Sequence, residues 1–125
     1  MTECILPGLE FPAVCKRRVD ARFDGGHVSS NGGALLIRQT DRRLRVTRRA
    51  ARLLEDARQQ GKVDHSALSI IRQRVFGVAL GYDDLNDHDF IRHDLCFQGA
   101  VDRDRPLASS STLCRFENSM TRSTA

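Results

Sequence analysis

The sequence predicts a mainly α-helical fold, a small helical bundle with a short amino-terminal β-hairpin. The first observation is the segment 64–94, where apolar residues at helical spacing precede a glycine and an acidic turn. The second is a set of further apolar segments on either side of it, separated by glycine, proline and charged residues. The chain has 125 residues, which corresponds to about one domain, and we expect its helical region to span residues 19–118.

The amino-terminal residues are expected to form an arm and then the hairpin. Two prolines and a glycine interrupt residues 1–18, which end in a basic triplet, so we predict an irregular basic arm there. Residues 19–23 alternate apolar and polar side chains, the period of a half-buried strand. Residues 24–26, Asp-Gly-Gly, provide a turn, and residues 27–29 provide a short return strand.

Two helices are expected before the central segment, over residues 34–44 and 48–60. Thr47 follows a break in the apolar pattern and is a residue type that can cap the second helix. Gly32 and Gly33 are interpreted as a turn, although glycines at a helix start can also bring backbone N–H groups close to a phosphate. The residues expected to face inward are Leu35, Leu36, Ile37, Leu53, Leu54 and Ala57. Those expected to face solvent are Arg38, Asp41 and Arg42.

The central helix is expected to begin near Ser66, whose hydroxyl can accept a hydrogen bond from a free backbone N–H. Gly81 is expected to end it in the left-handed conformation. The apolar face is predicted to consist of Leu68, Ile71, Val75, Val78 and Ala79, with Arg72, Gln73 and Arg74 mostly off that face. In the helix that follows, Leu85, Phe90 and Ile91 are expected to face inward.

The carboxyl-terminal part is predicted to contain a short helical segment at 95–101 and a capped helix within 107–118. Leu113 and Phe116 are expected to face inward, and Thr112 and Arg115 outward. This arrangement is similar to the second helix of a helix-turn-helix unit, although capping alone explains the serines. Residues 119–125 are expected to be a frayed and truncated tail.

Positive charge is concentrated in one short segment. Residues 1–60 hold 12 Lys and Arg against 7 Asp and Glu, whereas residues 61–125 hold 8 against 9. Six arginines occur without an intervening acid: Arg42, Arg43, Arg45, Arg48, Arg49 and Arg52. A polyanion is the natural partner of such a cluster, and a solvated charged surface is the alternative. If one helix ran through the break, four of them would share a stripe: Arg42, Arg45, Arg49 and Arg52.

Other patterns argue against a membrane protein or a recognisable enzyme. No apolar run reaches the length of a membrane span, and the amino terminus does not have the pattern of a secretion signal, so we expect a cytoplasmic protein. The four cysteines are far apart and are interpreted as ordinary thiols. No P-loop, nucleophile elbow or dinucleotide fingerprint is present. We therefore assign no catalytic residue and no metal ligand.

Five aspartates form the main acidic cluster: Asp83, Asp84, Asp87, Asp89 and Asp94. Asp84 and Asp87 could share a helical face and bind Mg²⁺, as in a small nuclease. We favour helix capping instead, because the helix dipole attracts acids to the first turn. His88 and His93 are five residues apart and do not share a face well, which argues against a metal pair.

Three strings carry a family resemblance. They are FDGGHVSSNGGALLIRQTDRRL at 23–44, RQRVFGVALGYDDLNDHDFIRHD at 72–94 and LASSSTLCRFEN at 107–118. In this order they resemble the amino-terminal region of group-one DDE transposases of bacterial insertion sequences. The resemblance implies a helical region that helps to hold transposon-end DNA, the terminal inverted repeats, and an association with the nucleoid.

The resemblance also implies a ribonuclease-H-like catalytic domain in which two Asp and one Glu bind a divalent metal such as Mg²⁺. In the family the first of these follows the segment that matches 107–118, so we expect a fragment without strand-transfer activity and without a cofactor of its own. The DNA-binding residues are predicted to be the six clustered arginines with Thr112 and Arg115. Full-length transposase or a second copy of the chain are further candidate partners. The alternative is a protein-interaction remnant that docks on a catalytic domain or has no function.

Overall fold

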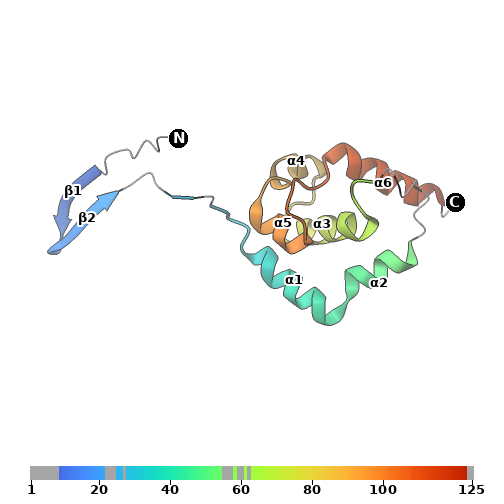
Figure 1. Cartoon of the computed structure of the whole chain (residues 1–125), viewed down its shortest axis with the longest axis horizontal. Coiled ribbons are helices and arrows are strands. Elements are labelled where there is room, and N and C mark those ends of the chain that lie inside the picture. The colour runs from blue at the N-terminus through green and yellow to red at the C-terminus, as the bar shows by residue number, and fades with distance from the viewer. Residues whose placement is uncertain are drawn as a thin grey trace.

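The structure is a computed structural model that describes residues 9–21, 25–26, 28–54, 58, 61 and 63–123. Within these residues the chain is mainly helical, as predicted (Figure 1). The strands are β1 (Leu9–Val14) and β2 (Arg17–Ala21). The helices are α1 (Gly33–Leu44), α2 (Val46–Leu53), α3 (Ala67–Ala79), the 3₁₀-helix η2 (Leu85–Asp87), α4 (His88–Ile91), α5 (Leu95–Val101) and α6 (Ser110–Ser123).

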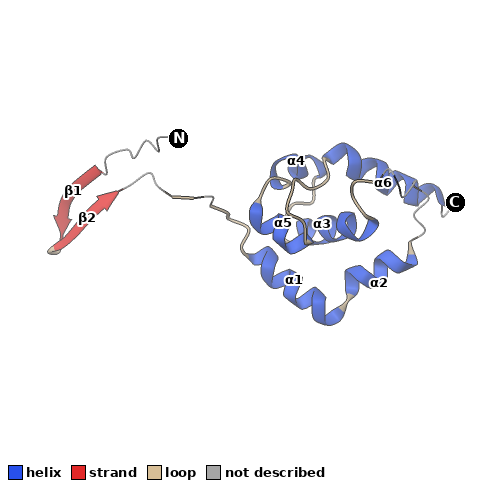
Figure 2. Cartoon of the chain, in the orientation of Figure 1, coloured by secondary structure: helices blue, strands red, loops and turns tan. Residues whose placement is uncertain are grey.

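The hairpin lies earlier in the chain than predicted. β1 and β2 pair antiparallel, with Leu9 opposite Ala21, so residues 9–18 are two strands and their turn and not an irregular arm, and the hairpin precedes the expected range 19–29 (Figure 2). The remaining parts of the two predictions, residues 1–8, 22–24 and 27, lie outside the described residues. Cys15 and Lys16 make the turn with φ of 49° and 64°, the left-handed conformation that a tight hairpin turn requires. Glycine is the residue type most often found in such a turn, and for this reason the turn was predicted at residues 24–26. Of these, residues 25–26 are described.

The first two helices meet at a single residue. Arg45, with φ of 58°, ends α1 and begins α2, and Figure 1 shows the two helices forming a V at this point. The second helix was predicted at 48–60, but it starts at Val46 and ends at Leu53, and Leu54 is extended. The predicted continuation, residues 55–60, is described only at residue 58.

The central helix α3 has the predicted ends but not the predicted face. Ser66 caps it by accepting a hydrogen bond from the Ser69 N–H, and Gly81 follows with φ of 95°. The buried residues are Ile70, Ile71, Arg72, Gln73, Phe76 and Gly77, whereas Val75, Val78 and Ala79 are exposed. The periodic pattern misled because α1, α2 and α5 all pack against α3, so its buried surface is wider than one apolar stripe.

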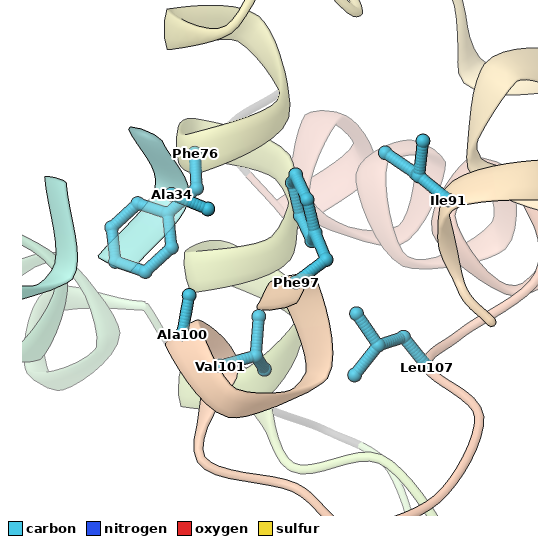
Figure 3. Close-up of a cluster of buried hydrophobic side chains, with 7 residues drawn as sticks. All are labelled: Ala34, Phe76, Ile91, Phe97, Ala100, Val101 and Leu107. Carbon is cyan, nitrogen blue, oxygen red and sulfur yellow. The ribbon is translucent and has the colours of Figure 1, made fainter. Parts of the chain in front are cut away.

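Two clusters of buried side chains hold the helices together. Figure 3 shows the first, which consists of Ala34, Phe76, Ile91, Phe97, Ala100, Val101 and Leu107. The second consists of Ile70, Ile71, Ala108, Leu113 and Phe116. The inward orientation predicted for Ile91, Leu113 and Phe116 is therefore confirmed. The predicted burial of Leu35, Leu36, Leu53 and Phe90 was wrong, because these side chains are exposed.

The carboxyl-terminal helices differ from the prediction in length and connection. The short segment 95–101 is a helix with the expected bounds. Helix α6 continues to Ser123, so residues 119–123, which were expected to fray, are helical. Met120 packs against the second cluster. The connection 102–109 between α5 and α6 is longer than the three to four residues of a helix-turn-helix, so that unit does not form.

Candidate nucleic-acid interface

An open, arginine-rich hollow lies at the corner between α1 and α2. Its volume is about 660 Å³. Its lining consists of Leu35, Arg38, Gln39, Asp41, Arg42, Arg45, Arg48, Arg72, Gly99 and Asp102. Five arginines thus face two aspartates in one concave surface. A concavity that gathers one sign of charge strengthens the local field and attracts the opposite charge.

The corner determines which of the predicted arginines gather. Arg42 lies in the last turn of α1, Arg45 is the linking residue, and Arg48 lies in the first turn of α2. Because the chain bends at Arg45, these three line one hollow instead of following a straight stripe. The single stripe depended on one helix running through the break, and this condition is not met because Arg45 separates α1 from α2. Arg49 and Arg52 do not line the hollow. Arg43, Arg49 and Arg52 are exposed on the same two helices.

A buried carboxylate fixes the corner. Asp41 was expected to face solvent but is 7% exposed, and its Oδ1 accepts a hydrogen bond of 3.0 Å from the Thr47 backbone N–H. The Thr47 hydroxyl donates to Asp41 Oδ2 at 2.5 Å. Thr47 is therefore not a helix cap but a buried partner of Asp41 across the bend. Arg38 adds an ion pair, with Nη1 3.7 Å from Asp41 Oδ2.

Arg72 of α3 lies at the buried base of the hollow. The residue is 6% exposed, and its Nε donates a long hydrogen bond, 3.5 Å, to the Thr47 hydroxyl. Burial and then the positive charge of Arg38 lower the pKa of Arg72 from its ordinary value, although a guanidinium still remains charged in a protein. The sequence interpretation missed Arg38 and Arg72 as site residues. The available signal was their positive charge, but their position on an inner helix face depended on the packing.

The other two predicted residues belong to a different hollow. Thr112 and Arg115 of α6 line a concavity of about 670 Å³. The remaining lining residues are Arg58, Val63, Asp64, His65, Phe116 and Ser119. Arg58 lies over the Phe116 ring, 5.0 Å from its centroid, and its Nη1 donates to the His65 carbonyl at 2.9 Å. The structure thus divides the eight predicted residues between two hollows and an exposed surface.

The acidic cluster serves the helix starts. Asp84 accepts a hydrogen bond of 2.9 Å from the Asn86 N–H at η2, and Asp94 accepts one of 2.9 Å from the Phe97 N–H at α5. Asp89 accepts two from Ser110 at the start of α6, and these bonds, the backbone one first, lower the pKa of Asp89. The capping interpretation is confirmed for Asp84 and Asp94.

The described residues do not provide the two Asp and one Glu that the resemblance implied as ligands of a divalent metal. No three His, Cys, Asp or Glu side chains come together there as a group that could hold a metal ion. Three members of the acidic cluster, Asp84, Asp89 and Asp94, accept hydrogen bonds from backbone N–H or hydroxyl groups. These residues therefore do not fit a divalent-metal triad.

The three strings that carry the family resemblance lie in contact. Ser29 and Asn31 of the first string donate to Asp94 Oδ2 of the second, at 2.7 Å and 3.3 Å. The Tyr82 hydroxyl donates to Asn31 Oδ1 at 2.8 Å. Asp89 links the second string to the third through Ser110. Two separate sets of polar contacts thus join segments that are far apart in the sequence.

Fold and site together define a small helical domain with a concave cationic surface. Comparison with known protein families matches residues 11–125 to the transposase DDE domain, group 1. The chain therefore belongs to the DDE transposase family, an enzyme family. Comparisons with curated proteins and with solved structures found no match. Over the described part of the chain, no helix has the length and apolar character needed to cross a membrane.

Proposed function

We propose that this chain binds transposon-end DNA through the arginine-rich hollow and has no strand-transfer activity of its own. The observation that carries the proposal is the convergence of Arg42, Arg45 and Arg48 with Arg38 and Arg72 on one concave surface. DNA phosphates are the densest source of negative charge that such a surface meets. Membership of a transposase family supports DNA, and in particular transposon ends, as the polyanion.

The absence of strand transfer is proposed from the use of the carboxylates. DDE chemistry requires acidic side chains that are available to bind divalent metal. Asp84 and Asp94 instead accept backbone N–H groups at helix starts, and Asp89 accepts the backbone N–H and the hydroxyl of Ser110. Under this proposal the chain holds DNA for a reaction that other residues perform.

The test compares two triple variants that remove the same charge from different places. One replaces Arg42, Arg45 and Arg48 of the hollow with Gln, and the other replaces the exposed Arg43, Arg49 and Arg52. Fluorescence anisotropy with terminal-repeat DNA and scrambled DNA, each over a salt series, gives the affinity and its salt slope. The hollow variant should lose roughly tenfold or more in affinity and reduce the slope by about 2 to 3, whereas the matched control should change both much less.

Each part of the proposal has its own contradicting result. Equal losses in the two variants would mean that DNA responds to net charge and not to the hollow. Cleavage of end DNA by the purified chain with Mg²⁺ would contradict the absence of strand transfer. No binding to either DNA at low salt would instead favour docking on a protein partner, for which the exposed Val75 and Val78 of α3 offer apolar surface.

A further inference from the structure

Arg72 of α3 lines the hollow but does not belong to the six clustered arginines of the sequence. We propose that the hollow binds a single phosphate oxyanion held by Arg72 at its base, with Arg45 and Arg48 at its rim. This inference rests on the proposed function, because it names the chemical group of DNA that the hollow takes. The oxyanion site can be tested separately from DNA binding, because a site for this group would also bind free phosphate.

The first argument is the charge balance of Arg72. A buried guanidinium is normally paired with a carboxylate, because the cost of removing it from water is otherwise not offset. Among the described residues Arg72 makes no carboxylate ion pair, and its one hydrogen bond to a side chain is the 3.5 Å contact with the neutral Thr47 hydroxyl. Asp41, which lines the same hollow, already accepts two hydrogen bonds from Thr47 and pairs with Arg38.

The second argument is the arrangement of like charges around Arg72. Arg38, Arg42, Arg45 and Arg48 line the same hollow, and Asp41 and Asp102 are its acids. Burial, followed by the positive charge of Arg38, lowers the pKa of Arg72; Arg48 acts in the same direction, and Asp41 and Asp102 act against it. Like charges gathered around a buried cation are destabilising unless an anion occupies the space between them.

The third argument is the chemistry of the guanidinium. Its planar set of donors matches two oxygens of a phosphate, and it is less strongly hydrated than an ammonium group. Arg45 forms the bend and Arg48 lies in the first turn of α2; both are exposed, so their long side chains can reach an anion from solvent. The Asp41–Thr47 contact fixes the bend, and the Thr47 hydroxyl accepts a hydrogen bond from Arg72, so this donor is positioned before binding.

The experiment measures thermal unfolding of the whole chain at constant ionic strength. Chloride is exchanged for inorganic phosphate in one arm and for dimethyl phosphate in the other. At ten times the dissociation constant, binding to the folded state alone should raise Tm by about 5 °C. A rise with dimethyl phosphate identifies the backbone diester of DNA as the source. A rise with inorganic phosphate alone identifies a monoester or free phosphate, and either rise supports the site.

Variants show whether Arg72 holds the anion. Arg72→Gln should abolish the phosphate-dependent rise, and Arg105→Gln, an exposed arginine in a loop outside the hollow, should keep it. If Arg72→Gln does not fold, as judged by circular dichroism, Arg72→Lys and Arg48→Gln take its place and should each reduce the rise at least twofold. An unchanged rise in the variants that fold would overturn the proposal.

The outcomes separate this inference from the proposed function. A wild-type chain that binds DNA but shows no rise in Tm with either phosphate overturns the oxyanion site and leaves DNA binding intact. A wild-type chain that shows the rise, lost in Arg72→Gln, but binds no DNA supports the site and overturns the proposed function.

Discussion

At the scale of single residues, the buried polar side chains of the core need hydrogen-bond partners within the protein. Gln73 of α3 donates from Nε2 to the Ala108 carbonyl at 2.9 Å and accepts from the Ala108 N–H at 3.0 Å. The same amide nitrogen lies 3.2 Å from Nδ1 of the fully buried His88. Since the amide nitrogen can only donate, Nδ1 of His88 accepts, and the imidazole is neutral with its proton on Nε2.

The surroundings of His88 predict a pH dependence of stability. Burial and then the positive charge of Arg74 lower the pKa of His88 from its ordinary value of 6.5. As the pH falls, His88 therefore binds a proton in the unfolded state before it does so in the folded state. The free energy of unfolding should be constant above about pH 7 and fall as the pH drops through 6.5. Denaturant unfolding at pH 7.5 and pH 5.5 measures this loss.

His65 needs a control, because burial and then Arg103 also lower its pKa. Replacing His65 with Gln should leave most of the loss between pH 7.5 and pH 5.5 in place. A loss that disappears in this variant would assign the pH dependence to His65 and contradict the role of His88.

At the scale of elements, the bend between α1 and α2 links stability to the site. Arg45 adopts a left-handed conformation that costs a residue with a side chain roughly 1 kcal/mol. Arg45→Gly should therefore raise the free energy of unfolding by about 1 kcal/mol while it weakens DNA binding, because the hollow loses one of its exposed cations. Denaturant unfolding and anisotropy measure the two effects, which go in opposite directions.

The same bend supplies a control. Arg45→Asn also removes the charge but tolerates the left-handed conformation less well than glycine does. Both variants should weaken DNA binding equally, with Gly the more stable. If DNA binding were unchanged in both, Arg45 would serve only the turn and the proposed surface would be wrong at this position.

At the scale of the whole molecule, local signals in the sequence predicted the helices better than their packing. The Ser66 cap, Gly81 and the helix at 95–101 were predicted correctly because they depend on residues near in sequence. Burial of Gln73 and His88 could not be predicted, because Gln73 bonds to the backbone of Ala108 and His88 bonds to Gln73, and these partners are 35 and 15 residues away in the sequence.

The candidate site shows the same division. The arginine cluster was visible as composition, but the selection of three of its members, and the addition of Arg38 and Arg72, follow from one bend and from the packing of α3. A left-handed Arg45 is not a conformation that residue type predicts. The sequence therefore predicted the concentration of positive charge, but not the concave surface on which some of these arginines gather.

The two hollows are connected across the molecule. A smaller concavity of about 250 Å³ shares Arg72 and Asp102 with the first hollow, and its lining includes Arg103. Arg103 donates to the Asp64 carbonyl at 2.8 Å and to its carboxylate at 3.2 Å, and Asp64 lines the hollow that contains Arg115. The two hollows are therefore linked through shared lining residues and the Arg103–Asp64 ion pair, with the arginines of the α1–α2 corner at one end and Arg115 of α6 at the other.

This continuity predicts that the contribution of Arg115 depends on DNA length. A short duplex held at the first hollow does not reach α6, whereas a longer one adds a phosphate contact there. Arg115→Gln should leave affinity for the short duplex unchanged but weaken the long duplex several-fold and reduce its salt slope by about 1. Anisotropy with a series of duplex lengths measures this, with Arg105→Gln as the control. An equal effect of Arg115→Gln at every length would mean that Arg115 adds only to the net charge, and no effect at any length would remove α6 from the DNA-binding surface.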